Sequence, residues 1–469
     1  MRDLLFDLGH KKFPVKVPDF SDILRMGNVS AIPNPEAEIY RSLRSPIKSP
    51  PLREIVRKKH RSNPKAEAVI VISDNTRPVP YSGKEGILFP ILDEMIQAGL
   101  APHRIRLLVA TGTHRTMDDG EVKEMLDPRV IALNLPIINH DSRNKSDMMK
   151  VGHTEFGGEI SVNRFYMESE IKILTGLVES HFMAGASGGR KSICPGLISE
   201  ALTHALHSGP ILHSPQARDL VLEGNPVHQE CLKVAKMAGC DMIVNVTLDA
   251  DYKLTGVFAG DLEEAHQEAV KKLRTYAAIP VQKEYDLVIT HAGFVGVNHY
   301  QAAKGALVCV PVIKQDGFCL LAACHTDKDP IGMQNYKRMI RLLGEVGTDT
   351  FIQMILDPAW AFVPEQWEAQ MWTRLFEKSP PGNLLYCSLE IAEDDFAWIP
   401  GTDTKALVGK TKSLQELTNK SIEWAVHKLK TSLGHTPLVA VLPDGPYGIP
   451  VKVNGSLSTP NISTQGKST

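Results

Sequence analysis

The stretch that most restricts the fold of this chain is a short apolar run at residues 66–73 (AEAVIVIS), which leads into the polar sequence DNTRPVP. Its length and its β-branched residues predict a strand that is buried on both faces, as in a parallel sheet. The same combination recurs at residues 106–110, which lead into TGTHR. Open α/β sheets bind their ligands beyond the carboxyl ends of such strands. We therefore expect an α/β fold with functional residues in these two polar clusters.

Segments with helical periodicity separate most of the predicted strands, which is typical of parallel βαβ units. Strands are predicted at residues 66–73, 106–110, 136–139, 171–177, 241–247, 286–290, 317–323, 384–387 and 438–442, and helices at 84–99, 119–126, 225–239, 261–276, 335–346, 365–378 and 413–430. Residues 1–66 are rich in proline and are expected to be irregular. Their basic stretch 53–61 lacks interleaved aromatic residues, so we interpret it as the solvated face of a helix.

The length of 469 residues is too great for one ordinary core and indicates two α/β domains with mainly parallel sheets. We expect a cofactor-binding domain over residues 1–280, a linker at 277–284 and a second α/β domain over residues 281–453. Residues 454–469 are rich in Ser, Thr and Asn and are predicted to form a disordered tail. Polar clusters follow strands in both domains, which favours an active-site cleft between them.

The composition excludes several classes of partner. The net charge of −2 gives no overall attraction to nucleic acid or to an anionic membrane. The sequence contains no run of about 18 apolar residues, so we expect no helix that spans a bilayer. The seven cysteines include no CxxC pair, and the first residues carry charges unlike those of a signal peptide. We expect reduced thiols and a cytoplasmic location.

A glycine-rich stretch at residues 178–208 (VESHFMAGASGGRKSICPGLISEALTHALHS) holds the densest group of candidate site residues. Gly188 and Gly189 would let the backbone approach an anion closely, and Lys191 follows them. A helix is expected to begin directly after this turn, at residue 195, and helix N-termini attract anions. We predict that the stretch holds a phosphate-bearing cofactor.

This stretch departs from the phosphate loop G-x-x-x-x-G-K-[ST] of nucleotide triphosphatases. Gly185 and Lys191-Ser192 fit the pattern, but Arg190 stands where the second glycine is required. A standard triphosphatase loop is therefore disfavoured. Two alternatives stay open: a phosphotransferase that uses the glycine-rich turn, and a non-catalytic protein that binds a hydroxy acid or another anion.

Histidines are the main candidates for proton transfer and metal binding. His114 and His181 lie at predicted strand ends, where two imidazoles could serve one substrate as acid and base. His204 and His207 lie three residues apart on one predicted helix face, a spacing compatible with a shared metal. No further ligand stands at ordinary zinc spacing, so a zinc site built by the protein alone is weakly supported.

Three cationic side chains are candidates for binding or attacking a substrate. Lys191 could pair with phosphate or act as a nucleophile toward a carbonyl carbon or a thioester. Arg77 and Lys304 are candidate clamps for a carboxylate, Arg77 through its bidentate fork.

Six motifs, spread over most of the chain, together resemble the nickel-dependent lactate racemase family, whose members carry a nickel-pincer nucleotide. They are SDNTRPVP at 73–80, ATGTHR at 110–115, ESHFMAGASGGRKSICPG at 179–196, ALHS at 205–208, YQAAKG at 300–305 and LPDGPYGIP at 442–450. The resemblance implies two α/β domains with the cofactor on the N-terminal one.

The resemblance also implies a role for individual residues. The cofactor would be a pyridinium-3-thioamide-5-thiocarboxylic acid mononucleotide that is attached covalently to Lys191 through its thioamide. His207 matches the nickel ligand, and the other metal bonds would come from a pyridinium carbon and two sulfurs. His114 and His181 match the two catalytic bases. The remaining matches are Asp74, Gly188 and Gly189 beside the cofactor, and Arg77, Tyr300, Gln301 and Lys304 around the substrate.

The activity implied by the resemblance is racemisation or C2-epimerisation of a 2-hydroxy acid. One imidazole would take the hydroxyl proton while the C2 hydrogen leaves as hydride to the cofactor, and the planar keto acid would take hydride back on its other face. The segment GFVGVNHYQ departs from the family pattern, with Val297 where an acidic residue is usual and an unexpected His299. The substrate therefore stays open among malate, phenyllactate, other aliphatic hydroxy acids and sugar acids. Cofactor-biosynthesis proteins are the implied partners for loading.

Overall fold

The structure is a computed structural model that describes residues 1–155 and 158–453. The chain divides into two compact units, each made of several segments. One unit contains Gly27–Ala277 and Met333–Thr373, and we call it the histidine unit. The other contains Met1–Met26, Ala278–Gly332 and the residues from Arg374 onward, and we call it the α11 unit. The predicted disordered tail at 454–469 lies outside the described residues.

The histidine unit is built on a six-stranded sheet in the order β13-β12-β9-β4-β5-β6. Its strands are β4 (Ala68–Ser73), β5 (Ile105–Ala110), β6 (Ile137–Asn139), β9 (Ile171–Leu177), β12 (Met242–Leu248) and β13 (Leu254–Gly260). All neighbours are parallel except β12 and β13. Five of the six residues of β4 are buried, as predicted for a strand covered on both faces.

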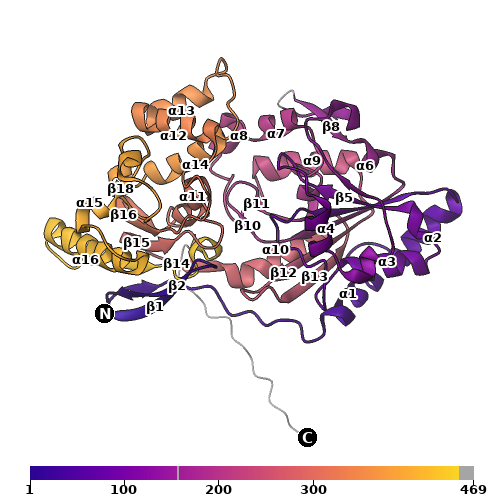
Figure 1. Ribbon diagram of the computed structural model, residues 1–469, viewed down its shortest axis with the longest axis horizontal. Coiled ribbons are helices and arrows are strands. Elements are labelled where there is room, and N and C mark those ends of the chain that lie inside the picture. The colour runs from indigo at the N-terminus through magenta and orange to yellow at the C-terminus, as the bar shows by residue number, and fades with distance from the viewer. Residues whose placement is uncertain (156–157, 454–469) are drawn as a thin grey trace, which may run out of the picture. The chain divides into compact units, whose positions relative to one another are not determined.

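Helices and two small hairpins complete the histidine unit (Figure 1). The helices are α1 (Pro35–Arg44), α2 (Leu52–Ser62), α3 (Leu88–Gln97), α4 (Asp119–Met125), α5 (Pro128–Ile131), α6 (Arg164–Glu168), α7 (Glu200–Leu206), α8 (Gly209–His213), α9 (Pro226–Ala238), α10 (Glu264–Ala277), α12 (Gln334–Val346), α13 (Thr348–Leu356) and α14 (Gln366–Phe376), which continues into the α11 unit. The hairpins pair β7 (Met148–His153) with β8 (Glu159–Asn163) and β10 (Ser180–His181) with β11 (Gly185–Ala186). Buried side chains of α1 to α5 share one core with the sheet.

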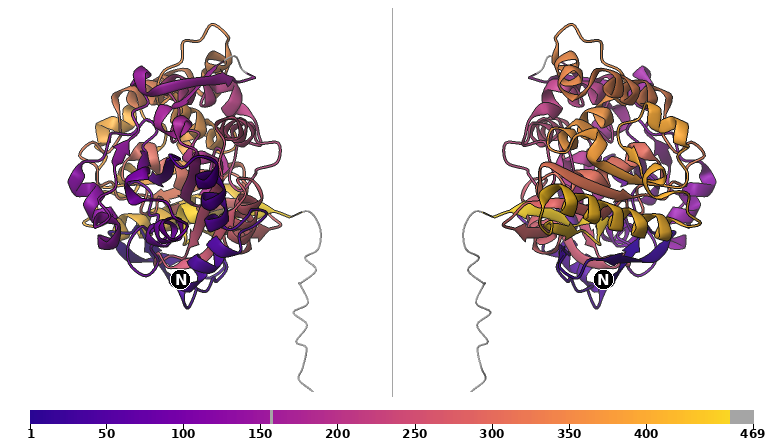
Figure 2. Two further views of the ribbon diagram at one scale, coloured as in Figure 1. Left: turned by 90° about the vertical axis from the view of Figure 1, so that its right-hand side faces the viewer. Right: turned by 90° about the vertical axis from the view of Figure 1, so that its left-hand side faces the viewer.

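The α11 unit contains a second six-stranded sheet, in the order β18-β17-β16-β15-β19-β3, and all of its neighbouring strands are parallel. Its strands are β3 (Asp22–Ile23), β15 (Tyr285–His291), β16 (Ile313–Ala322), β17 (Leu384–Cys387), β18 (Thr402–Asp403) and β19 (Val439–Val441). The other elements are the hairpin of β1 (Arg2–Asp7) with β2 (Lys12–Val17), the pair of β14 (Ala278–Val281) with β20 (Ile449–Lys452), and the helices α11 (His299–Leu307), α15 (Thr404–Val408) and α16 (Leu414–Leu433). Helix α16 lies across the strands of this unit in the right-hand view of Figure 2.

The predicted α/β class with mainly parallel sheets is confirmed, but several local expectations were wrong. Residues 1–66 are not irregular, because β2 alternates buried and exposed residues and packs Phe13 and Val15 into the core of the α11 unit. The same region contains α1 and α2. The supposed linker at 277–284 contains β14, which pairs with β20. Both errors involve contacts with distant segments, because the first hairpin packs on a core whose other members lie beyond residue 280, and β14 pairs with a strand more than 150 residues later.

The predicted domain ranges differ from the two units at two segments. Residues 1–26 belong with the C-terminal sheet because β3 pairs with β19 and the first hairpin packs on the same core. Residues 333–373 belong with the N-terminal sheet, where Gln370 donates a hydrogen bond to the Gly209 carbonyl at 2.8 Å. The predicted cleft between the domains remains a prediction.

Buried histidines make the stability of this fold sensitive to mild acid. Six are almost fully enclosed: His140, His228, His266, His291, His299 and His325. Burial lowers the pKa of each, to about 3 in His228 and His299 and to about 4 in His291. The unfolded chain takes up protons below about pH 6.5, whereas the folded chain resists them until the pH nears these lower values.

We therefore expect the free energy of unfolding to fall as the pH decreases from about 6.5 toward 4. Each fully buried histidine contributes up to about 1.4 kcal/mol per pH unit. Urea unfolding followed by fluorescence at pH 7.5, 6.0 and 5.0 measures this loss. Replacing the exposed His435 by Gln should leave the pH dependence as it is. A midpoint that stays constant between pH 7.5 and 5.0 would contradict the expectation.

Within the described ranges, no helix has the length and apolar character needed to cross a bilayer. All seven cysteines are free thiols, as we predicted.

Candidate functional site

Three neighbouring parallel strands bring the main candidate residues to one edge of the sheet in the histidine unit. Strand β4 lies between β9 and β5, and the three run in the same direction. Asp74 directly follows β4, His114 follows β5, and His181 lies in β10 shortly after β9. The residues that the sequence places after these strands therefore gather at the carboxyl end of the sheet.

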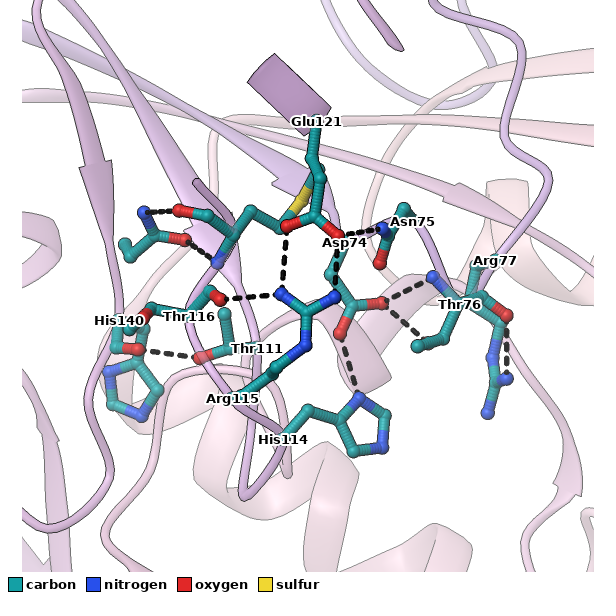
Figure 3. A network of polar contacts seen from close by, with 12 residues as sticks. Asp74, Asn75, Thr76, Arg77, Thr111, His114, Arg115, Thr116, Glu121 and His140 are labelled. Atoms are coloured by element: carbon teal, nitrogen blue, oxygen red, sulfur yellow. Dashed lines mark hydrogen bonds and ion pairs between the residues drawn. The ribbon is translucent and has the colours of Figure 1, made fainter. Parts of the chain in front are cut away.

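Asp74 and His114 form a close pair between the loops that follow β4 and β5 (Figure 3). His114 Nδ1 lies 2.7 Å from Asp74 Oδ2, and the Asp74 side chain is only 5% exposed, against 51% for His114. Burial acts to raise the pKa of Asp74, but the hydrogen bonds from His114 and Thr76 outweigh it and lower the pKa. Asp74 is therefore a carboxylate at neutral pH, and in the neutral form of the His114 ring Nδ1–H donates to it while Nε2 carries the lone pair.

A second group of polar contacts ties these two loops together (Figure 3). Arg115 donates to both carboxylate oxygens of Glu121, and Asn75 Nδ2 donates to Glu121 Oε1 at 3.0 Å. The hydrogen bonds with Arg115 lower the pKa of Glu121 to about 2. The sequence analysis missed this cluster. The capping-box pattern of Asp118 and Glu121 at the start of α4 was the available signal, since it brings Glu121 back toward the loop.

The glycine-rich turn has a conformation that only glycine adopts readily. Gly188 and Gly189 have φ of 74° and 52°. A Cβ on Gly188 would lie 2.6 Å from Val178, and one on Gly189 would lie 2.9 Å from the His266 ring. The Gly189 N–H donates to Asn245 Oδ1 at 2.8 Å, which fixes the turn against β12. The side on which a side chain would stand is filled by Val178 and His266, so glycine is required here for the close packing of the turn against the rest of the unit.

Arg190 and Lys191 point to different environments although they are adjacent. Arg190 is 1% exposed and donates to the Ala184 carbonyl at 2.8 Å and lies 2.9 Å from His266 Nε2. Arg190 therefore anchors the turn to the buried interior of the unit, through His266 and the Ala184 carbonyl. The Lys191 side chain, in contrast, is only half-buried. Burial, with the nearby charges of Arg190 and Arg77, lowers the pKa of Lys191 to about 8.

The prediction that a helix begins at residue 195 was wrong. Residues Gly189–Ser192 form a 3-10 turn, and α7 begins only at Glu200, where Ser199 caps it by accepting a hydrogen bond from the Leu202 N–H. The amides of an α-helix N-terminus therefore do not follow the glycine turn. Glycine and proline at 195–196 interrupt the periodicity that suggested the earlier start.

His181 and Lys191 form the second close pair of the site. His181 Nε2 lies 3.2 Å from Lys191 Nζ. His181 Nδ1 accepts hydrogen bonds from the backbone N–H groups of Met183 and Ala184, at 3.3 and 3.2 Å. A neutral imidazole carries one proton, so these contacts assign the His181 proton to Nε2.

His207 ends α7 with its ring held in one orientation. Its Nδ1 lies 2.7 Å from the Thr203 carbonyl, so Nδ1–H donates and Nε2 keeps its lone pair. Burial lowers the pKa of His207 to about 4, which keeps the ring neutral at pH 7. The His204 ring stacks on Phe362 at a centroid distance of 4.8 Å, and the His207 ring lies 5.1 Å from that of Trp367. A metal shared by His204 and His207 stays a prediction.

The residues present fit a cofactor that brings most of its own metal ligands. Across residues 1–155 and 158–453, no three His, Cys, Asp or Glu side chains are grouped to hold a metal ion. His207 Nε2 offers a single neutral ligand, and Lys191 offers an amine for attachment. The buried Asn245 Nδ2 beside the glycine turn has no hydrogen-bond partner among the described residues, so this cradle retains an unused donor.

The predicted substrate residues are divided between the units. Arg77 belongs to the histidine unit, where its guanidinium donates to the Thr76 carbonyl at 3.2 Å. Tyr300, Gln301 and Lys304 belong to α11, which Asn298 caps by accepting from the Gln301 N–H at 2.9 Å. Gln301 and Lys304 are three residues apart and partly exposed, so they share a helix face.

The fold and this site define an α/β protein with two histidines and a lysine at the strand ends of one sheet. Residues 8–219 match the family model of the lactate racemase N-terminal domain. The lactate racemase of Lactiplantibacillus plantarum is 32% identical over 415 residues, which cover 88% of this chain and 90% of that protein. That of Thermoanaerobacterium thermosaccharolyticum is 31% identical over 381 residues, covering 80% and 86%. The chain belongs to the lactate racemase family and is an isomerase.

Solved structures agree with this assignment. The lactate racemase apoprotein of Thermoanaerobacterium thermosaccharolyticum superposes with a TM-score of 0.80 at 26% identity, covering 97% of this chain and all of that one. A Thermotoga maritima protein superposes with a TM-score of 0.59 at 16% identity, covering 86% and 97%, and shares the fold.

Proposed function

We propose that the chain interconverts the configurations at C2 of a 2-hydroxy acid, as a racemase or a C2-epimerase, with a nickel-pincer nucleotide attached to Lys191. Lactate, the substrate in the names of the relatives, is the first candidate. His114 and His181 are the proposed acid–base pair, and His207 is the proposed nickel ligand.

The observation that supports this proposal is that the hydrogen bonds at Nδ1 differ between the two histidines. In the neutral rings they leave Nε2 without a proton in His114 and with a proton in His181. His114 uses its Nδ1–H on Asp74, so its Nε2 is a base. His181 uses Nδ1 as an acceptor, so its Nε2–H is an acid. A base and an acid of the same residue type are thus present together at the ends of nearby strands, which suits a reaction that runs in both directions.

His114 and His181 are proposed to transfer the hydroxyl proton of the two enantiomers. When bound, the nucleotide supplies the acceptor and donor of the hydrogen at C2. His114 Nε2 takes the hydroxyl proton of one enantiomer, and the Asp74 carboxylate stabilises the imidazolium that results. His181 Nε2–H gives a proton to the oxygen when the opposite enantiomer forms. In the reverse direction the two histidines exchange these tasks.

The remaining residues bind and orient the substrate. Arg77 offers a planar guanidinium for the carboxylate. Gln301 and Lys304, on one face of α11, are proposed to contact the carboxylate and the hydroxyl, with Tyr300 beside them. Gly188 and Gly189 are proposed to lie beside the nucleotide, and cofactor-biosynthesis proteins in the cytoplasm are the proposed partners that load it.

The test is to purify the chain after co-expression with the cofactor-assembly proteins. We expect nickel, an increase in intact mass located on Lys191, and racemisation of at least one member of a panel that includes lactate, malate, phenyllactate and a sugar acid. Chiral chromatography measures the last. A bare polypeptide mass and no racemisation across the panel, from cells that load a known lactate racemase, would contradict the proposal.

A further inference from the structure

We propose that His181 has a second task that precedes catalysis: it favours the uncharged form of the Lys191 amine, which is the form that the incoming cofactor can thioacylate. This inference rests on the proposed attachment of the cofactor at Lys191. It assigns a role to His181 in the apoprotein, before any substrate is bound.

The first step of the argument is the hydrogen-bond direction between the two side chains. His181 Nδ1 is occupied by the Met183 and Ala184 N–H groups, so the ring proton is on Nε2, 3.2 Å from Lys191 Nζ. An ammonium group has three donors and no acceptor, so it cannot receive this proton. A neutral amine has one lone pair and can. The contact is therefore satisfied only when both side chains are uncharged.

The second step is that an additional proton has no favourable position in this pair. A proton on His181 Nδ1 would face two backbone N–H donors and displace their hydrogen bonds. A proton on Lys191 Nζ would face the Nε2–H of His181. Both placements bring donor against donor, so the geometry favours the neutral amine.

The environment of Lys191 also favours the uncharged amine, because its net effect is to lower the pKa of Lys191. Burial has the largest effect on Lys191, and Arg190 and Arg77 add positive charge nearby, while the thiols Cys231 and Cys194 act against them. The effects of burial and of the two arginines are larger than the effect of the thiols, so the pKa of Lys191 is lowered to about 8. An ordinary exposed lysine has a pKa of about 10.4. The charge environment and the tautomer of His181 thus agree.

The attachment step that this arrangement serves is a condensation. The Lys191 nitrogen forms a bond to the carbon of a thiocarboxylic acid arm, and the carbon–oxygen bond breaks. The oxygen leaves as water with one proton from the amine and one from the acid, and the sulfur stays on carbon as the thioamide. A nitrogen in a thioamide is no longer a base, so it releases His181 Nε2–H toward the substrate.

The experiment measures the state of Lys191 in the apoprotein, without cofactor or turnover. Acetic anhydride labels neutral amines, and peptide mass spectrometry gives the labelling rate of Lys191 between pH 6 and 10 relative to the 85% exposed Lys410. We expect a midpoint near pH 8 for Lys191. In His181→Phe, which keeps a ring but removes the Nε2–H, the midpoint should rise by about one pH unit and labelling at pH 7 should fall several-fold.

A matched variant and a second readout separate the possible causes. His114→Ala removes the other proposed base and should lose turnover, yet keep the labelling profile of Lys191 and full attachment after co-expression with the assembly proteins. His181→Phe should accumulate several-fold less attached cofactor. His181→Asn, whose amide is too short to reach Lys191, should behave like His181→Phe and replaces it if the phenylalanine variant does not fold.

An unchanged labelling profile in the folded His181 variants, or a Lys191 midpoint near pH 10 in the unmodified chain, would overturn the inference. Failure of the proposed function has a different signature. The unmodified chain would then acquire no adduct in cells that load a known lactate racemase, whereas the labelling result in the apoprotein would stand by itself.

Discussion

Lys191→Arg should fold normally, carry no covalent adduct and lack racemase activity. The amine nitrogen is the proposed point of attachment, and a guanidinium cannot replace it because it stays protonated at all working pH values. Arginine keeps a long cationic side chain at this half-buried position, so the packing around the glycine turn should survive. The effect is expected to be large, with racemisation reduced at least about a thousandfold, to the background of the assay.

Three measurements check this prediction. Intact mass should match the bare polypeptide after co-expression with the assembly proteins, nickel content should fall with it, and the urea midpoint should stay close to that of the unmodified chain. Lys410→Arg, at an exposed position, should behave like the unmodified protein in every respect. Racemase activity that persists in Lys191→Arg would show that attachment at this residue is not needed.

Asp74→Asn should load the cofactor normally and lose most of its turnover. The carboxylate accepts from His114 Nδ1–H at 2.7 Å and thereby leaves Nε2 as the base. An amide at this position can present its own N–H to the ring, which reverses the tautomer and places the His114 proton on Nε2. It also removes the charge that stabilises the imidazolium. A comparable Asp-to-Asn change in a serine protease costs about 10⁴ in kcat, and we expect a loss of about 10² to 10⁴ here.

The comparison with Thr76→Val tests whether the His114 contact is the cause. Thr76 also hydrogen-bonds the Asp74 carboxylate, through its N–H and hydroxyl, but at Oδ1, whereas His114 bonds Oδ2. Its hydroxyl can be removed while the pair with His114 stays, so kcat should change by no more than about tenfold. Adduct mass and nickel content should be unchanged in both variants. Equal losses of kcat in the two variants would contradict the role of Asp74 in setting the tautomer.

Much of the fold could be predicted because its signals are local. The run at 66–73 is apolar throughout and forms a strand buried on both faces. Asn225 followed by Pro226 predicted the start of α9, where Asn225 caps the helix as expected. Strand β17 has the predicted bounds, Leu384–Cys387. In each case the residues that determine the element lie within it or directly beside it.

The errors occurred where distant segments decide the outcome. The hairpin of β1 and β2 forms on the core of the α11 unit, and its alternating pattern is too short to stand out among prolines. Strand β14 exists through pairing with β20, more than 150 residues later in the chain. His204, whose spacing from His207 is compatible with a shared metal, stacks on Phe362 from the segment between α13 and α14. No local pattern reports such partners.

By itself, the amino-acid sequence determined which residues follow the central strands, and therefore that Asp74, His114 and His181 meet at one edge of a sheet. This succeeds because strand periodicity is local and parallel strands place their carboxyl ends together. Only the tertiary structure decided that Arg190 turns inward while Lys191 lies beside His181, and which hydrogen-bond partner each ring nitrogen of His114 and His181 faces. Those outcomes depend on donors and acceptors that folding brings together, and on the burial that folding creates.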